Sequence, residues 1–487
     1  MTDNFSKCLK FASVLAGCYL IFVALFSRSL ADNDLWGYLA FGRIFWEEGY
    51  FPYHDIFSYT PTKPLWIYHE WLTGVFFYAV FKFSGPVGLQ LLRYITIILA
   101  VYFIYLTAIK RGGSPISALI ALLPAAVLIS FGYVPVRAQV FTYLFFILTL
   151  YILEVARQDK KRQVLWWLIP IQILWCNFHG GFLAGIGVIF LYAAGEGAAG
   201  KKFLPFVKTG IVASFATLIN PYGFKYWVFM CQAVSMTRPE ITEWMSVFAA
   251  IKMHVQAAPV CIFVCLSIFC LILFGFRRKH DITDILVVIV ILYLGYKHIR
   301  HSVLFGLVFG AYVPVVLSEC WKGWKEKFVF FTSRQWMPKV FLLAFFLTIY
   351  GFINPSLSST LTPSFNISIP SSHYPIGALR FLQARNFRGN VLPHFDWGEF
   401  LVWTCYPYCK VAMDGRYETV YKEDINQEYF DFLMGRENWR AFLVKYPHDV
   451  VLIKPNTRTY FLMLREPLWR LAYSDLGCAL FLLKRLA

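Results

Sequence analysis

Residues 257–276 read AAPVCIFVCLSIFCLILFGF, and Arg277, Arg278 and Lys279 follow at once. The run contains no charged residue and has the length of a bilayer-spanning helix, which needs about 20 apolar residues. The basic triplet is typical of a cytoplasmic loop, because Lys and Arg are enriched on that side of a membrane. The stretch therefore predicts a membrane-spanning helix that ends in the cytoplasm.

Similar apolar runs recur through most of the chain and predict a mainly α-helical transmembrane bundle. The hydrophobic fraction of the 487 residues is 58% and the charged fraction is 15%, whereas a soluble domain averages roughly 45–50% and about 25%. Such a chain cannot bury its apolar side chains in one aqueous core, so we expect a multi-pass protein of about eleven spans in the lipid bilayer. The expected spans are 9–30, 87–109, 115–132, 138–156, 164–178, 182–199, 203–219, 257–276, 282–297, 301–318 and 339–354.

The positive charge of the chain predicts its orientation. The formal net charge is +17, but the basic residues gather in short loops between apolar runs, which argues against a nucleic-acid partner. An N-terminus in the cytoplasm and alternating spans place the most basic loops inside, as the positive-inside rule requires. We expect this topology in the plasma membrane. The loops expected inside are 110–113, 157–163, 200–202, 277–281 and 320–338.

Two regions outside the spans are long and polar enough to carry function. The first extracytoplasmic loop covers residues 31–86. Its segment 66–83 is expected to be an amphipathic or a re-entrant helix near the outer surface, since a further span there would invert every later loop. A linker rich in Ser, Thr and Pro follows residue 354. The expected domains are therefore a transmembrane catalytic domain, 1–354, and an extracytoplasmic tail, 355–487.

The tail alternates short apolar runs with helical patterns and predicts a small α/β domain with a mixed sheet. Its expected strands are 389–393, 400–403, 410–413, 450–453 and 479–483, and its expected helices are 376–386 and 424–445.

Asp32 and Asp34 directly follow the first apolar run and are the leading candidates for chemistry. Two carboxylates at this spacing can share a divalent cation such as Mg²⁺ or Mn²⁺. Alternatively, one carboxylate can act as a general base while the other orients it. A third interpretation is that both are interfacial charges that end a helix.

Further polar residues lie at span ends on the side expected to hold Asp34. Charged groups beside hydrocarbon often face a cavity or a partner, and cations there suit the phosphate of a lipid carrier. Snorkelling, helix capping and interfacial placement are the alternatives. The candidates for the donor phosphate are Arg93, Arg137, His179, Arg300 and His301, and those for other substrate contacts are Asp55, His69, Glu70, Asn177, Glu243 and Trp244.

The sequence resembles the GT-C membrane glycosyltransferases, a class that includes protein O-mannosyltransferases, the aminoarabinose transferase of lipid A and oligosaccharyltransferases. The resemblance rests on D-L-W at 34–36, D-I-F-S-Y-T at 55–60, H-E-W-L at 69–72 and D-G-R at 414–416. It departs from the mannosyltransferase pattern, because no His-Pro-Pro follows Asp55 and the family's Asp-Glu pair is here Asp32 and Asp34. We favour Asp34 as the catalytic residue.

The resemblance implies an extracytoplasmic transfer of a sugar from a polyprenyl-phosphate donor to a hydroxyl of a glycan, lipid or protein acceptor. A direct displacement would invert the anomeric centre. Two other functions fit a chain of this kind. They are a transporter or flippase of lipid-linked glycans, and an O-antigen-ligase-like enzyme that uses a diphosphate-linked glycan.

Overall fold

The computed structural model describes residues 17–27, 29–277, 279–324 and 363–484. Its contacts divide the chain into two compact units. The helical unit comprises Met1–Ser29, Gln90–Gly223 and Ser235–Asn366, and the mixed unit comprises Leu30–Leu89, Phe224–Val234 and Ile367–Ala487. The first polar loop thus belongs to the same unit as the tail. The expected domain boundary at 354–355 lies outside the described residues.

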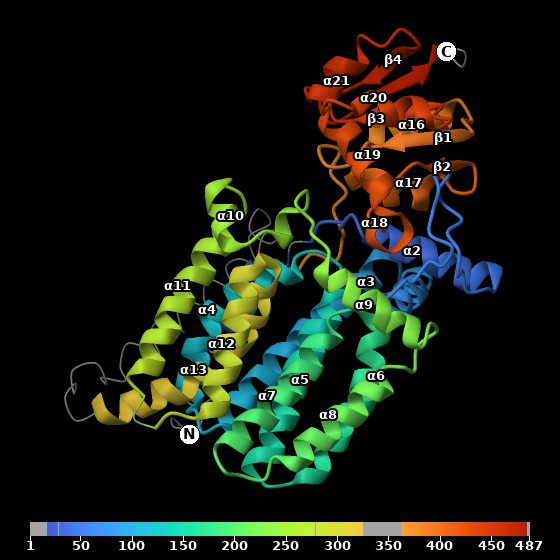
Figure 1. Cartoon of the computed structure of the whole chain (residues 1–487). Helices are drawn as coiled ribbons and strands as arrows, with labels where there is room; N and C mark the ends of the chain where they lie inside the picture. Colours follow the sequence, from blue (N-terminus) through green and yellow to red (C-terminus); the bar gives the residue numbers. More distant parts are fainter. Residues whose placement is uncertain (1–16, 28, 278, 325–362, 485–487) are drawn as a thin grey trace, which may run out of the picture. The chain divides into compact units, whose positions relative to one another are not determined.

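The helical unit is a bundle in which α4, α5, α7, α12 and α13 lie side by side (Figure 1). These helices follow from the apolar runs of the sequence. The elements are a helix at Gly17–Phe26, α3 (Trp71–Lys110, shared with the mixed unit), α4 (Pro115–Tyr133), α5 (Gln139–Gln158), η2 (Arg162–Trp167), α6 (Leu168–Phe178), α7 (Phe182–Ala198), α8 (Leu204–Ala216), η3 (Thr242–Trp244), α10 (Val247–Lys252), α11 (Ala257–Gly275), α12 (Ile282–Lys297), η4 (Ile299–His301) and α13 (Ser302–Trp324).

Among the described residues, 5 helices are long and apolar enough to cross a membrane. They begin at Trp71, Pro115, Gln139, Ala257 and Ile299. Shorter apolar helices occupy several of the other expected spans, and the expected span at 339–354 lies outside the described part of the chain. The mainly helical architecture expected from composition is confirmed, whereas the number of about eleven spans stays a prediction.

The expected amphipathic segment at 66–83 begins as a helix at Trp71 and is continuous in α3 up to a break at Gly85. Gly85 adopts φ 59° and ψ −155°, which a residue with a side chain rarely adopts. Pro86 follows and cannot donate a backbone hydrogen bond into the preceding turn. The break separates the expected surface segment from the apolar helix after it. Its placement at the membrane surface stays a prediction.

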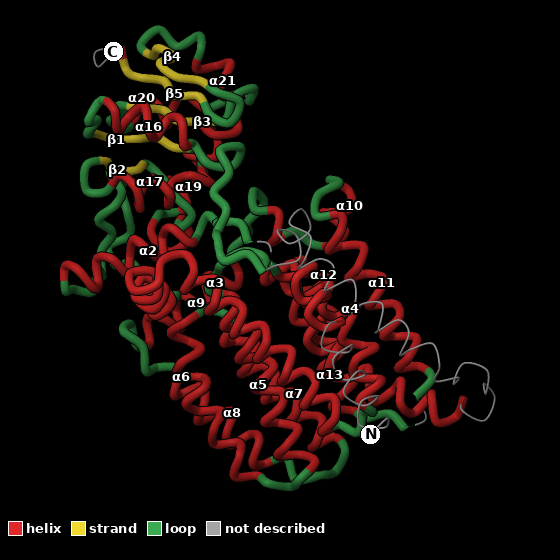
Figure 2. Tube along the Cα trace, turned by 180° about the vertical axis from the view of Figure 1, so that it is seen from behind, coloured by secondary structure: helices red, strands yellow, loops and turns green. Residues whose placement is uncertain are grey.

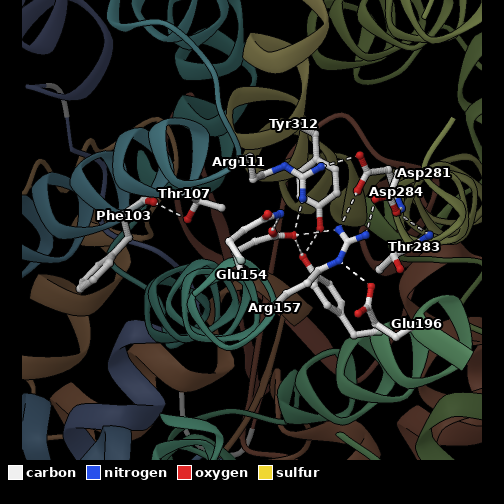
Figure 3. A network of polar contacts seen from close by, with 12 residues as sticks. Phe103, Thr107, Arg111, Glu154, Arg157, Glu196, Asp281, Thr283, Asp284 and Tyr312 are labelled. Carbon is white, nitrogen blue, oxygen red and sulfur yellow. Dashed lines mark hydrogen bonds and ion pairs between the residues drawn. The ribbon is translucent and has the colours of Figure 1, made fainter. Parts of the chain in front are cut away.

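Seven charged residues at one end of the helical unit form a buried cluster, which we call the ion-pair cluster. Its members are Arg111, Glu154, Arg157, Glu196, Arg277, Asp281 and Asp284. Figure 3 shows the Arg157 guanidinium facing the carboxylates of Glu196 and Asp281, and Nε lies 2.7 Å from Glu196. Arg111 pairs with Glu154 and lies 2.6 Å from Asp284. The cluster ties α5, α7 and α12 together.

The mixed unit contains a five-stranded sheet of order β2-β1-β3-β5-β4, with helices packed around it (Figure 2). β1 is parallel to β2 and β3, and β5 is antiparallel to β3 and β4. Its elements are α2 (Leu35–Arg43), η1 (Ile44–Glu48), the first part of α3, α9 (Phe224–Ser235), α16 (Ile376–Ala384), β1 (Gly389–Pro393), η6 (Phe395–Trp397), α17 (Gly398–Cys405), β2 (Cys409–Val411), α18 (Tyr417–Val420), α19 (Glu423–Met434), α20 (Trp439–Lys445), β3 (Val450–Ile453), α21 (Arg458–Met463), β4 (Trp469–Ser474) and β5 (Ala479–Leu483).

Three of the strands expected in the tail, at 389–393, 450–453 and 479–483, coincide with β1, β3 and β5. The strand expected at 400–403 is wrong, because these residues lie in α17. Their continuous apolar run fits a buried helix as well as a buried strand. The single helix expected at 424–445 is divided at Gly435, whose φ of 60° ends α19. β4, with its mostly half-exposed side chains, was not expected.

The first polar loop extends the sheet beyond β2. Ser58 forms a parallel bridge with Val411, the Val411 N–H donates to the Phe57 carbonyl at 3.0 Å, and the Tyr59 N–H donates to the Val411 carbonyl at 3.2 Å. The loop thereby covers an edge strand that would otherwise leave backbone groups unpaired. Within the mixed unit, these bonds join residues from the start of the chain to the tail.

Candidate functional site

Asp34 and Asp32 have different surroundings in the mixed unit. Asp34 occupies the position before α2, but its side chain makes no capping hydrogen bond to that helix. Asp32 instead accepts a hydrogen bond from the Asp34 N–H at 3.1 Å through Oδ1. The two carboxylates therefore have different roles in the structure. Asp32 supports the turn, whereas the Asp34 carboxylate faces the tail.

The Asp34 carboxylate lies near that of Glu399, a residue of α17. A β-carbon added to Gly415 would lie 2.8 Å from Glu399 Oε1 and 3.4 Å from Asp34 Oδ1, so both carboxyl groups border this glycine. Glu399 Oε2 accepts a hydrogen bond from the Gly37 N–H of α2 at 3.1 Å. Glu399 is 6% exposed. Two carboxyl groups from distant parts of the sequence thus form one site.

Burial raises the pKa of Glu399 well above its ordinary value, because a charged carboxylate loses hydration there. The negative charges of Asp34 and Asp414 raise it further. The Arg416 guanidinium and the Gly37 N–H act in the opposite direction and do not outweigh them. The pKa of Glu399 is therefore raised by its burial and by its carboxylate neighbours together.

His69 and Glu70 lie in the same unit, near Tyr68. The Tyr38 hydroxyl donates to Glu70 Oε2 at 2.9 Å, and His69 Nε2 lies 3.7 Å from Glu70 Oε1. Burial raises the pKa of Tyr68 well above its ordinary value, and the charges of Glu70, Glu399 and Asp34 add to this effect. Tyr68 thus connects the predicted substrate residue Glu70 with the Asp34 site.

Asp55, another predicted substrate residue, belongs to a clamp that holds the first loop to the tail. Asp55 Oδ1 lies 2.7 Å from Arg416 Nη1, and its Oδ2 accepts the Ser58 N–H at 2.8 Å. Arg416 also binds Asp414, with Nη2 2.5 Å from Oδ2. The guanidinium lies 4.7 Å from the Trp66 ring centroid. These buried contacts favour a structural role for Asp55 and for the Asp414-Gly415-Arg416 motif.

Five predicted residues of the helical unit lie together in a second site, the arginine cluster. The cluster consists of Arg137, Arg238, Glu243, Trp244, His298, Arg300 and His301, of which Arg238 and His298 were not predicted. Arg137 Nη1 donates to Glu243 Oε2 at 2.9 Å, and Arg300 Nη1 lies 3.4 Å from Glu243 Oε1.

Trp244 forms the centre of the arginine cluster. The guanidinium groups of Arg238 and Arg300 lie 4.1 and 4.5 Å from its ring centroid, which is the range of cation–π contacts. His298 Nδ1 lies 2.6 Å from the Trp244 carbonyl oxygen. Segments that are far apart in the sequence thus present their cations around one ring.

The arginine cluster carries more positive than negative charge and stays accessible. The side chains of Arg137 and Arg300 are 18% and 19% exposed. Burial raises the pKa of Glu243, but Arg137 and Arg300 outweigh it and hold the pKa at about 2, so this carboxylate is ionised at neutral pH. Two arginines, Arg137 and Arg300, pair with one carboxylate, and guanidinium groups suit an anionic group such as phosphate.

The remaining predicted residues of the helical unit make contacts with the backbone. Arg93, 2% exposed, donates from Nη1 to the Tyr133 carbonyl at 2.7 Å and from Nη2 to the Phe26 carbonyl at 2.6 Å. Asn177 donates to the Ile219 carbonyl at 2.9 Å. His179 Nδ1 accepts the Gly181 N–H at 2.9 Å, which makes it part of a turn after α6. These contacts favour structural roles.

The sequence suggested that Asp32 and Asp34 could bind Mg²⁺ or Mn²⁺. In the part of the chain that the structure describes, no group of three or more His, Cys, Asp or Glu is placed to hold a metal ion. Asp32 in addition accepts a backbone hydrogen bond. The described side chains therefore provide no complete ligand set for either ion.

Two solved structures are similar to this chain. A crystal structure of ArnT from Cupriavidus metallidurans bound to undecaprenyl phosphate matches over 99% of this chain and 98% of its own, with a TM-score of 0.53 and 12% identity. An oligosaccharyltransferase from Archaeoglobus fulgidus, crystallised with Zn and sulfate, covers 91% of this chain and 68% of its own, with a TM-score of 0.49 and 12% identity. No family model and no curated protein sequence matches the chain. The similarity to ArnT confirms the GT-C fold expected from the sequence.

Proposed function

We propose that this protein is a glycosyltransferase that moves a sugar from a polyprenyl-phosphate donor to an acceptor hydroxyl on the extracytoplasmic side of a bacterial inner membrane. The observation that carries the proposal is the Asp34 carboxylate, which leaves its helix uncapped and borders Gly415 together with the buried carboxyl group of Glu399. The fold of ArnT, a protein crystallised with undecaprenyl phosphate, supports a lipid-linked donor.

In the proposed reaction, Asp34 accepts the proton of the acceptor hydroxyl as a general base. The acceptor oxygen then forms a bond to the anomeric carbon, and the bond between this carbon and the phosphate oxygen breaks. The polyprenyl phosphate leaves with the electron pair, and the anomeric centre is inverted. The acceptor is a hydroxyl of a glycan, a lipid or a protein.

Arg137, Arg300 and His301 of the arginine cluster stay predicted ligands of a phosphate group. Cations fixed in place before the reaction stabilise the charge that develops on a leaving phosphate. His69, Glu70 and Trp244 stay candidates for contacts with the sugar or the acceptor. Because Arg93, Asp55, Asn177 and His179 make structural contacts, we leave them out of this assignment.

The arginine cluster would equally suit a flippase of lipid-linked glycans, which needs a phosphate site but no base. Transfer by the purified full chain from a panel of radiolabelled polyprenyl-phosphate sugars to membrane extract separates the two functions. We expect Asp34→Asn to lower the rate about 10²–10⁴-fold, the usual contribution of a general base, and Asp32→Asn to lower it less. A wild-type rate in Asp34→Asn would contradict the mechanism.

Two further versions of the transfer assay test which donor the protein uses and whether it needs a metal ion. Diphosphate-linked glycans supplied as donors test the O-antigen-ligase-like alternative. A chelator added to the wild-type reaction tests for Mg²⁺ or Mn²⁺, which can bind through one or two carboxylates together with substrate phosphates.

A further inference from the structure

The order of the parallel strands in the tail creates a point at which the chain changes direction across the sheet. From β1 the chain passes to β2 on one side, and it then returns to β3 on the other side of β1. In open sheets of parallel strands, ligands bind in the crevice outside the carboxyl ends of the two strands at such a point. The carboxyl ends of β1 and β3 are therefore the expected position of a binding site.

A pocket of about 300 Å³ lies at these carboxyl ends. His394 directly follows β1, and Lys454 directly follows β3. The His394 N–H donates to the Leu452 carbonyl of β3 at 2.6 Å, which holds the two strand ends together. The volume is at the lower end of the range for small-molecule sites, so it suits a ligand of about the size of a monosaccharide. The pocket is lined by His394, Leu433, Met434, Ile453, Lys454, Thr457 and Arg458.

Contacts between α19 and α21 fix another part of the lining. Thr459 Oγ1 of α21 donates to the Phe432 and Leu433 carbonyls at the end of α19, at 2.8 and 2.9 Å. Gly435 ends α19, and a β-carbon there would lie 3.0 Å from Arg458 Cγ. The aliphatic part of Arg458 therefore packs beside the end of α19. These bonds hold the pocket in shape within the tail itself.

The lining contains two cations, Lys454 and Arg458, and no carboxylate. Asp396 lies next to the pocket, 2.7 Å from Lys454 Nζ and 3.5 Å from His394 Nδ1, and it balances the charge of Lys454. No carboxylate among the described residues pairs with Arg458. The pocket therefore offers an uncompensated guanidinium beside apolar side chains, and a guanidinium group binds phosphate or carboxylate with two parallel hydrogen bonds.

We propose that this pocket binds the oxyanion, a phosphate or a carboxylate, of a ligand of monosaccharide size, with Arg458 and Lys454 as the partners of the anion. Leu433, Met434 and Ile453 contact the uncharged part of the ligand. These residues differ from those of the Asp34 site and of the arginine cluster, so the inference does not depend on the proposed transfer reaction.

Equilibrium binding to the purified full chain in detergent tests the pocket, with radiolabelled glucose phosphate, glucuronate and glucose as probes. We expect saturable binding of at least one of the two anions and much weaker binding of glucose. A preference for glucose phosphate supports a phosphate site, and a preference for glucuronate supports a carboxylate site. If neither anion binds, or if glucose binds as tightly as the anions, the proposal is wrong.

Arg458→Gln and Lys454→Gln locate the binding. Each variant removes a charged hydrogen-bond donor and should weaken anion binding roughly 10- to 100-fold. Arg465→Gln, which removes an exposed guanidinium just after α21, is the matched control and should bind as wild type does. Arg458 is exposed, so we expect its variant to fold, and thermal unfolding checks this.

Two results of the comparison would overturn the location. One is an equal loss of binding in Arg458→Gln and Arg465→Gln, which would indicate a diffuse positive potential. The other is binding that survives in Arg458→Gln but is lost in Arg300→Ala, which would place the anion at the arginine cluster.

Discussion

The ion-pair cluster and the arginine cluster lie at opposite ends of the helical unit and use the same residue types differently. Arg157 is in the last turn of α5, whereas Arg137 precedes the first residue of that helix, about 30 Å away at 1.5 Å per residue. The ion-pair cluster sets three arginines against four carboxylates, and Glu154 is 0% exposed. In the arginine cluster, Arg137 and Arg300 pair with Glu243 and their side chains are 18% and 19% exposed, and Arg238 lies over the Trp244 ring.

This comparison separates charges that hold the bundle together from charges that remain accessible to a ligand. A buried charge is stable only when a partner compensates for its lost hydration. A partly exposed cation can exchange water for a phosphate oxygen. We therefore expect changes in the ion-pair cluster to alter stability, and changes in the arginine cluster to alter binding.

The largest effect is expected for Arg157→Ala in the ion-pair cluster. The variant leaves Glu196 and Asp281 without their shared guanidinium, and the loss of one partner of a buried pair costs roughly 3–5 kcal/mol. Thermal unfolding in detergent should show a marked loss of stability. Lys110→Ala is the control. The side chains of Lys110 and Asp159, which form an ion pair, are 29% and 31% exposed, so this variant should lose less than about 1 kcal/mol of unfolding free energy. Equal losses of stability in Arg157→Ala and Lys110→Ala would show that the buried ion pairs stabilise the bundle no more than an exposed pair does.

An intermediate effect is expected for Arg300→Ala in the arginine cluster. A hydrogen bond to a charged group contributes about 1.5–3 kcal/mol, so binding of undecaprenyl phosphate should weaken roughly 10- to 100-fold with little change in thermal stability. Lys297→Ala removes an exposed cation at the end of α12 and is the matched control. If both variants weaken binding equally, a diffuse positive potential and not the cluster attracts the phosphate.

The smallest effect is expected for Glu243→Gln, which increases the positive surplus of the arginine cluster. Undecaprenyl phosphate should bind a few-fold more tightly at neutral pH, because one competing carboxylate is gone. The pKa of Glu243 is lowered to about 2 in the folded protein, so its stabilising pairs are complete above its ordinary pKa of 4.5 and are lost as the pH falls toward 2.

Thermal unfolding between pH 4.5 and pH 2 should therefore show an acid-dependent loss in wild type that is smaller in Glu243→Gln. Glu428→Gln, which changes an exposed carboxylate paired with Lys445 in the mixed unit, is the control and should retain the wild-type loss. An unchanged acid response in Glu243→Gln would show that its pairs with the arginines are not formed in solution.

Much of the helical unit could be predicted because a long apolar run has few alternatives to a helix in a membrane. The expected span 115–132 corresponds to α4, and 182–199 corresponds to α7. The tail was harder, since short apolar runs do not distinguish a strand from a buried helix. Residues 400–403 illustrate this, because they form part of α17 and pack against α2 through Phe400 and Trp36.

The candidate sites, too, could be predicted only in part from the sequence. The sequence indicated Asp34, Arg137 and Arg300 by their residue types and by their positions beside apolar runs. It gave no signal that Glu399 faces Asp34, since the hydrogen bond that fixes Glu399 joins Gly37 to a residue 362 positions away. Asp55 and Arg416 were both noticed, but only their contact shows that they form one clamp.

The sequence by itself determined the membrane-embedded helical class, the polar first loop and the mixed character of the tail, because hydropathy and charge act locally along the chain. Only the tertiary structure decided which charges are compensated and which carboxyl groups meet. Those properties depend on contacts between distant segments, and burial in such contacts changes the protonation of a carboxyl group such as that of Glu399.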